Sequence, residues 1–147
     1  MNQTTYLKNE AVTREWRIAS AKGRILGKVA VAAATALMGK TKASWTPNVD
    51  SGDFVIVTDI EGVVTTGKKQ SDKIYRFHSG WMGGLTELKL ETMMANKPEK
   101  VLELAVKRML PKTILGSHML KRLKVYKGSA HPHVSQAPKP LGMLKPL

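Results

Sequence analysis

The sequence predicts a single α/β domain with parallel strands. Residues 16–19 alternate as a short strand does, residues 27–38 repeat apolar side chains at helical spacing, and residues 54–58 are continuously apolar or β-branched. A strand, a helix and a strand covered on both faces are typical of a βαβ unit, in which the two strands run parallel. The 147 residues and the 42% hydrophobic content are enough for one domain with its own core.

Composition divides the chain into three parts. Residues 1–14 are polar and are expected to form a loosely held arm, and residues 15–128 the folded domain. Residues 129–147 contain four prolines and predict an extended tail.

The first half supplies the βαβ unit. Glycines predict a turn within residues 21–27, and Gly39 predicts the end of the following helix. Residues 40–53 predict a loop, in which Asp50 and Asp53 are expected to bond to backbone N–H groups of turns.

The middle of the chain gives weaker signals. Residues 63–66 predict a short strand, 67–69 a basic turn, and 73–78 an edge strand or extended arm. The glycine-rich segment 79–84 predicts a loop, and residues 85–95 have the apolar spacing of a helix.

Two further helices are predicted at residues 98–109 and 114–122, with Pro98 in the first turn and Pro111 ending the first of them. The start of the second helix is mostly apolar, whereas a helix-turn-helix DNA reader needs base-reading side chains there. Its leucines and methionine are expected to face the core, and three cations are expected to remain solvated: Lys121, Arg122 and Lys124.

The charge balance indicates a polyanionic partner. The formal net charge is +13, and residues 104–147 contain nine Lys or Arg and no Asp or Glu. A solvated basic face is the alternative, but unpaired positive charge over a third of a chain is typical of phosphate binding. A membrane partner is disfavoured because no uncharged helical run approaches the ~20 apolar residues of a span.

The sequence predicts no targeting peptide and no cysteine chemistry. The first ten residues lack the apolar stretch of a secretory signal and carry an acid, so neither a signal nor a transit peptide is expected. The absence of cysteine excludes disulfides and thiolate metal sites and suits a reducing compartment.

Two glycine motifs resemble nucleotide loops without meeting their requirements. Residues 62–69 match a phosphate loop until Lys69, which stands where a Ser or Thr hydroxyl must reach Mg²⁺. Residues 23–27 lack the adjacent G-x-G of a dinucleotide site, although the helix start beside Arg24 and Lys28 is suited to an RNA phosphate.

Catalytic and metal chemistry also find little support. His131 and His133 provide too few ligands for a closed metal site, and no carboxylate or serine accompanies His78 or His118 in a nucleophile arrangement. We therefore expect no enzyme activity, metal, cofactor or small-molecule substrate.

Several long segments, in order, resemble the ribosomal protein L13 family of the large subunit. They are GRILGKVA at 23–30, WTPNVDSGDFVIV at 45–57, TGKKQSDKIYRFHSGWMGGL at 66–85, and AVKRMLPKTILGSHMLKRLKVYKG at 105–128, followed by HPH. The resemblance implies a three-layer α/β/α domain on a small, mainly parallel sheet, with extended basic loops and tail. It also implies binding to large-subunit rRNA, neighbouring ribosomal proteins as partners, an early role in subunit assembly, and a ribosomal location in the cytoplasm or an organelle.

The resemblance and the charge pattern together nominate RNA contacts. Positions matching the family are Lys40, Lys42, Lys68, Lys69, His78, Lys112, Lys121, Arg122, Lys124 and Lys127. The charge pattern and the helix start add Arg24, Lys28, Lys107, Arg108, His131 and His133. The alternative functions are a free regulatory RNA-binding protein acting away from the ribosome and, with less support, a nucleotide-dependent enzyme.

Overall fold

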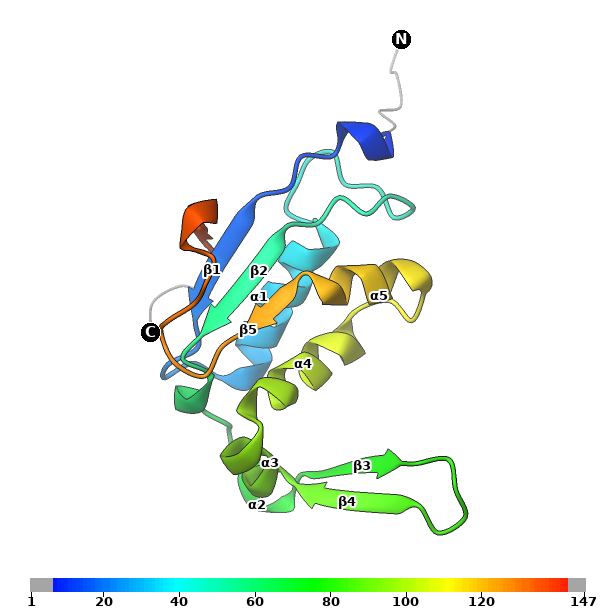
Figure 1. The fold of residues 1–147 in the computed structure, drawn as a ribbon, viewed down its shortest axis with the longest axis vertical. Helices are drawn as coiled ribbons and strands as arrows, with labels where there is room; N and C mark the ends of the chain where they lie inside the picture. Colours follow the sequence, from blue (N-terminus) through cyan, green and yellow to red (C-terminus); the bar gives the residue numbers. More distant parts are fainter. Residues whose placement is uncertain (1–6, 143–147) are drawn as a thin grey trace.

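A computed structural model describes residues 7–142 of the chain (Figure 1). Strands and helices alternate through its first half, and helices predominate afterwards. In chain order the elements are η1 (Asn9–Ala11), β1 (Trp16–Ser20), α1 (Leu26–Met38), β2 (Phe54–Thr58), η2 (Ile60–Gly62), α2 (Lys69–Asp72), β3 (Ile74–His78), β4 (Leu85–Lys89), α3 (Leu90–Asn96), α4 (Pro98–Met109), α5 (Ile114–Lys121), β5 (Leu123–Val125), η3 (Val134–Gln136) and β6 (Lys139–Pro140).

A four-stranded parallel sheet in the order β5-β2-β1-β6 forms the centre of the fold. The register pairs Trp16 with Phe54 and Ile18 with Ile56, so β1 and β2 run side by side along their whole length. The predicted α/β class, the βαβ unit and the mainly parallel sheet flanked by helices are confirmed.

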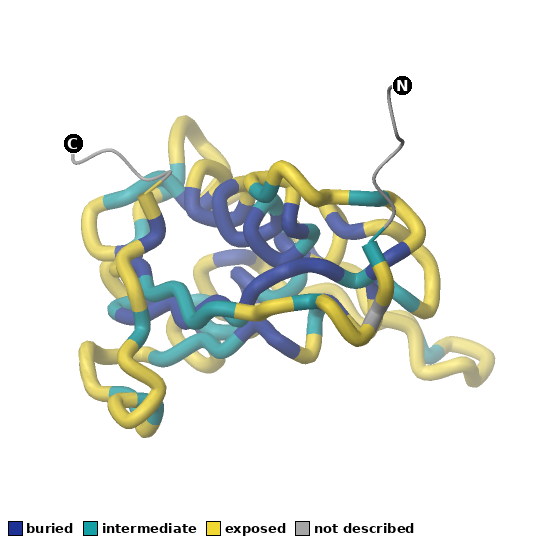
Figure 2. Tube along the Cα trace, turned by 90° about the horizontal axis from the view of Figure 1, so that it is seen from above, coloured by how far each residue is buried: buried dark blue, intermediate teal, exposed yellow. Residues whose placement is uncertain are grey.

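Helices α1, α4 and α5 contact one another and cover one face of the sheet. Val55 and Val57 of β2 are fully buried in the core that these helices share. The alanines of α1 leave space for close packing, and Gly39 ends the helix in the left-handed conformation, with φ of 76°. Buried positions accordingly gather in the middle of the body and exposed ones on its loops (Figure 2).

The predicted tail, as far as Gly142, packs on the opposite side of the sheet. The segment carrying η3 crosses in front of β1 (Figure 1), and β6 adds to the sheet by pairing with β1. This proline-rich segment contains a short 3-10 helix, η3, and a two-residue edge strand, β6. Residues 143–147 of the tail and 1–6 of the predicted arm lie outside the described residues.

An antiparallel hairpin of β3 and β4 projects from the body (Figure 1). The predicted strand at 73–78 is confirmed, whereas the helix predicted for 85–95 is half wrong. Its first five residues form β4, with Leu85 opposite His78 and Lys89 opposite Ile74, and only Leu90–Asn96 is helical. Pairing with β3 outweighs the local helical spacing.

The strand predicted at 63–66 is reduced to one bridge. Val64 pairs with Ile25 in parallel, and its carbonyl accepts from the amide of Leu26 at 3.0 Å. The basic turn that follows leads directly into α2, a single helical turn.

Candidate nucleic-acid interface

A groove of about 280 Å³ lies between the start of α1 and the end of α4, and we call it the α1–α4 groove. It brings together two predicted RNA contacts, Lys69 from α2 and Arg108 from α4. Its other polar or open positions are Gly27, Thr66, Lys73 and Tyr75. Segments distant in sequence therefore place cations around one concave surface.

A second groove, of about 500 Å³, lies at the junction of α4 and α5, and we call it the α4–α5 groove. Lys107 and Lys112 line it, together with the exposed Ile114. At the start of α5 the amide of Gly116 donates to the hydroxyl of Thr113 at 3.3 Å. A Cβ at Gly116 would lie 1.9 Å from the carbonyl oxygen of Pro111, so only glycine permits this tight entry into the helix.

The remaining predicted contacts are distributed over several elements. Half-buried positions are Arg24 and Lys124, and exposed positions are Lys28, Lys40, Lys68, His78, Lys121 and Lys127. Lys40 lies over the ring of Trp45 at 5.8 Å, and the ring of His78 accepts a hydrogen bond from the amide of Gly80 at 3.0 Å. These side chains are accessible to a large partner but do not form a single pocket.

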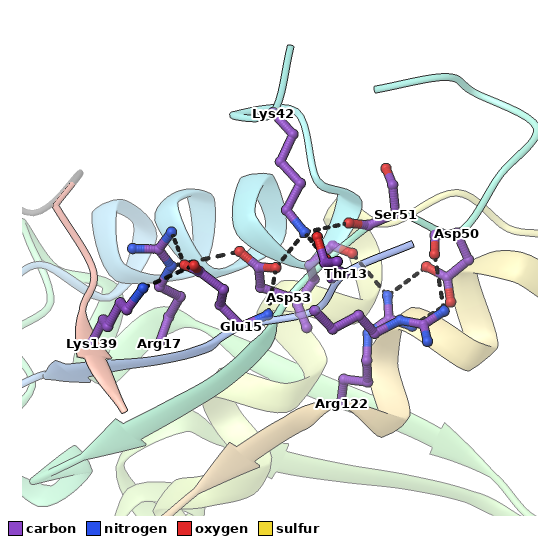
Figure 3. A network of polar contacts seen from close by, with 11 residues as sticks. Thr13, Glu15, Arg17, Lys42, Asp50, Ser51, Asp53, Arg122 and Lys139 are labelled. Atoms are coloured by element: carbon purple, nitrogen blue, oxygen red, sulfur yellow. Dashed lines mark hydrogen bonds and ion pairs between the residues drawn. The ribbon is translucent and has the colours of Figure 1, made fainter. Parts of the chain in front are cut away.

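Arg122 is a correction, because the structure buries a side chain predicted to be solvated. It is 7% exposed, its guanidinium contacts both carboxylate oxygens of Asp50, and it donates to the carbonyl of Leu37 at 3.1 Å (Figure 3). A Cβ at Gly52 would lie 1.7 Å from that same carbonyl oxygen and 3.0 Å from Nη2 of Arg122. Arg122 therefore joins α5 to the end of α1 and to the loop before β2.

Lys42, which was predicted to contact RNA, makes contacts within the protein. Its Nζ lies 2.5 Å from a carboxylate oxygen of the buried Asp53 and donates to the carbonyls of Thr13 and Ser51 (Figure 3). Asp53 also accepts from the amide of Glu15 at 3.1 Å. Asp53 therefore bonds to a backbone N–H group outside its own loop, and not to one in a turn as had been predicted, and it also pairs with Lys42.

The same network extends to the edge of the sheet (Figure 3). Glu15 lies 2.6 Å from Arg17 and 2.9 Å from Nζ of Lys139 in β6. Its hydrogen bond with Lys139 and the charge of Arg17 hold the pKa of Glu15 below its ordinary value. Lys139 thereby links the tail to the start of β1.

The two tail histidines pack against aromatic rings. His133 lies 4.9 Å from Trp16 between ring centroids, and its Nε2 is 2.8 Å from the hydroxyl of Tyr126. Nδ1 of His131 accepts from the amide of His133. Trp16 in turn stacks on Phe54 at 4.4 Å. The structure thus gives these histidines a packing role that the RNA prediction did not include.

Three residues that the sequence argument did not nominate lie at the grooves or on the exposed surface. Lys73 and Tyr75 line the α1–α4 groove, and Trp81 at the tip of the hairpin is 80% exposed. The alternation of residues 73–78 predicted a strand, but it did not indicate that Lys73 and Tyr75 would line a groove. For Trp81, the available signal was an aromatic residue within the glycine-rich loop SGWMGG.

Other kinds of site are not seen in residues 7–142. No cluster of three or more His, Cys, Asp or Glu side chains is placed to hold a metal ion there. Within the same residues, every helix is too short or too polar to cross a bilayer.

Comparison with known proteins identifies the family. Residues 14–132 match the description "Ribosomal protein L13". The chain is 50% identical over 138 residues to "Large ribosomal subunit protein uL13" of Thermosipho africanus. The aligned residues cover 94% of this chain and 93% of the relative. The chain is 51% identical to the protein of that name in Dictyoglomus thermophilum (96% and 99% covered) and 49% identical to the one in Pseudomonas putida (95% and 98%). These are names of a structural protein, in agreement with the prediction that the chain is not an enzyme. The chain belongs to the ribosomal protein L13 family.

Proposed function

We propose that this protein binds large-subunit rRNA through its basic surface and supports an early step of large-subunit assembly. One observation supports this more than any other. Of the nine cations in residues 104–147, Arg122 and Lys139 are in ion pairs. Six others in the described part of the chain form no ion pair there: Lys107, Arg108, Lys112, Lys121, Lys124 and Lys127.

Phosphate groups are the natural counter-ions for these six side chains. They project from α4, α5, β5 and the segments between, which the buried core holds in fixed relative positions. Because the core already fixes the backbone that carries these cations, only their side chains need to be ordered when a folded RNA of matching shape binds. Contacts to phosphates position a protein without reading sequence, which suits a role in stabilising RNA tertiary structure.

The salt dependence of rRNA binding tests the proposal. If about six cations contact phosphates, the affinity should fall by roughly 10³ between 50 and 200 mM salt, because counter-ions are released on binding. Affinity that does not change with salt would contradict the proposal.

The location and the assembly role need separate measurements. We infer that the protein resides on cytoplasmic ribosomes, so the endogenous protein should sediment with large subunits through a high-salt gradient. Sedimentation away from subunits would favour the free regulatory RNA-binding protein, and sedimentation with organellar subunits would move the location there. Omitting the protein from the first step of subunit reconstitution should delay the appearance of complete large subunits.

A further inference from the structure

Strand β1 would be an open edge of the sheet without the tail. The sheet order places β1 between β2 and β6, and β6 is only two residues long. The opposite edge is β5, a strand of three residues that carries Lys124. β1 has five residues, so it offers the longer row of backbone N–H and C=O groups. Rows of this kind recruit strands from other molecules when nothing covers them.

The tail closes this edge at its centre. β6 pairs with Arg17 and Ile18, and the amide of Leu141 donates to the carbonyl of Ile18 at 2.8 Å. We call residues 139–141 the edge cover. Because its contacts lie in the middle of β1, a strand from another molecule can pair with the whole of β1 only by displacing the edge cover.

The edge cover does not itself offer a new edge. Successive N–H groups of a strand point to opposite edges, and the amide of Leu141 points toward β1. The nitrogen of Pro140 is therefore directed to the outer edge, where it has no hydrogen to donate. Lys139 places a charge beside it, on a side chain that is 62% exposed. A short strand, a lysine and a proline are features by which proteins prevent further strand addition.

The burial of Leu141 is the main anchor of the edge cover. Leu141 is 9% exposed and belongs to the same hydrophobic core as the helices. Nζ of Lys139 lies 2.9 Å from a carboxylate oxygen of Glu15, but this ion pair is exposed and contributes little (Figure 3). Earlier in the tail, the ring of His133 packs on Trp16 with 4.9 Å between centroids. The edge cover can therefore be released by changing one buried side chain.

We propose that the edge cover keeps the free protein monomeric by occupying the part of β1 that would otherwise pair with β1 of a second copy. A second copy is the partner that this surface fits, because two identical edges related by a twofold axis satisfy each other's N–H and C=O groups. The inference is independent of the proposed function, since it concerns the chain before it meets RNA.

Leu141→Asp is the main test, with Val134→Asp as its matched control. An aspartate at position 141 cannot remain buried without a partner, whereas Val134 is 72% exposed in the same tail. Sedimentation of RNA-free protein is measured in salt that screens the net charge of +13, because this charge opposes association. As the concentration increases, the mass should rise from that of a monomer to that of a dimer for Leu141→Asp, while Val134→Asp and the wild type remain monomers.

Lys139→Glu loosens the edge cover without altering the core, so it provides the test if Leu141→Asp does not fold. It places a second carboxylate beside Glu15 and should cause dimerisation at higher protein concentrations than Leu141→Asp does. Lys127→Glu makes the same change in charge at an exposed position outside the edge cover and should leave the protein monomeric. Hydrogen exchange at the amide of residue 141, which is bonded to Ile18, measures the release in each variant.

Release of the edge cover without dimerisation would overturn the proposal. In that case the amide of residue 141 exchanges faster in the folded variants, yet they sediment as monomers. Dimerisation of Val134→Asp or Lys127→Glu to the same extent would also overturn it, because the association would then arise from the added charge, as would a wild type that already dimerises. None of these results affects the proposed function, which is judged by the salt dependence of rRNA binding.

Discussion

Replacing Arg122 with alanine should destabilise this protein by about 3 kcal/mol. Removing one partner of a buried ion pair typically costs ~3–5 kcal/mol, because the other charge is left uncompensated. The side chains of Arg122 and Asp50 are 9% and 14% exposed, so some water can reach Asp50 and the low end of that range applies. The carbonyl of Leu37 also loses a hydrogen-bond donor. For a domain of this size the melting temperature should fall by roughly 6–12 °C.

The assay is equilibrium unfolding in denaturant at neutral pH, with Lys121→Ala as the matched control. Lys121 is the preceding residue and is exposed, so its substitution should change stability by less than about 0.5 kcal/mol. A double-mutant cycle with Asp50→Ala should be strongly non-additive, because each single substitution leaves a charge that the double variant lacks.

The opposite pattern would refute the burial argument. If Arg122→Ala unfolds at the denaturant concentration of Lys121→Ala but binds rRNA much more weakly while fully folded, Arg122 acts on RNA as the sequence analysis predicted.

Three other substitutions test separate features. Trp81 is exposed, so Trp81→Ala should leave the free energy of unfolding within about 0.5 kcal/mol of the wild type. If the ring stacks on a base, the same substitution should weaken rRNA binding, measured at constant salt, by about 1–3 kcal/mol. Trp81→Phe should retain most of the affinity. Gly116→Ala should lower the midpoint of unfolding, because the Cβ of the alanine would clash with the carbonyl of Pro111. Helix propensity alone predicts the opposite, a gain in stability of about 1 kcal/mol. A higher midpoint would therefore contradict the close packing at this position. The lowered pKa of Glu15 stabilises the folded state above the ordinary Glu pKa, and this contribution is lost as the pH falls through the folded-state pKa. Unfolding of Glu15→Gln should therefore depend less on pH below about pH 4.5 than that of the wild type, and an equal dependence would show that the Lys139 contact is unimportant.

The sequence was sufficient where structure depends on neighbours along the chain. The apolar spacing of α1 and the glycine after it determine where the helix ends, and the run Phe54–Thr58 has the burial of a central parallel strand. Pro98 occupies the first turn of α4 as predicted. For the two helix ends the deciding interactions lie within a few residues of one another, whereas the continuous apolar run of β2 records its burial even though its partners, β1 and β5, are distant in sequence.

Prediction failed where distant segments decide the structure. Leu85 and Leu88 have the spacing of a helix, but hydrogen bonding to β3 makes them part of a strand. The charge of Arg122 indicated solvent or phosphate, because a sequence pattern does not show that Asp50, 72 residues away, lies beside it. The sequence also could not show that the hydroxyl of Tyr75 lacks a hydrogen-bond partner among the described residues, because this depends on which distant groups pack around it.

The cations of the last third of the chain therefore serve two different purposes. Its ion-paired members, Arg122 and Lys139, reach back to Asp50 and Glu15, which belong to the first half of the sequence. These pairs attach α5 and β6 to the start of the sheet, so they help to form the scaffold that holds the other cations in place. Loss of Arg122 and loss of Lys121 should then both reduce the amount of rRNA complex, but for different reasons. Only the Arg122 defect should recover when the temperature is lowered to where the variant is fully folded.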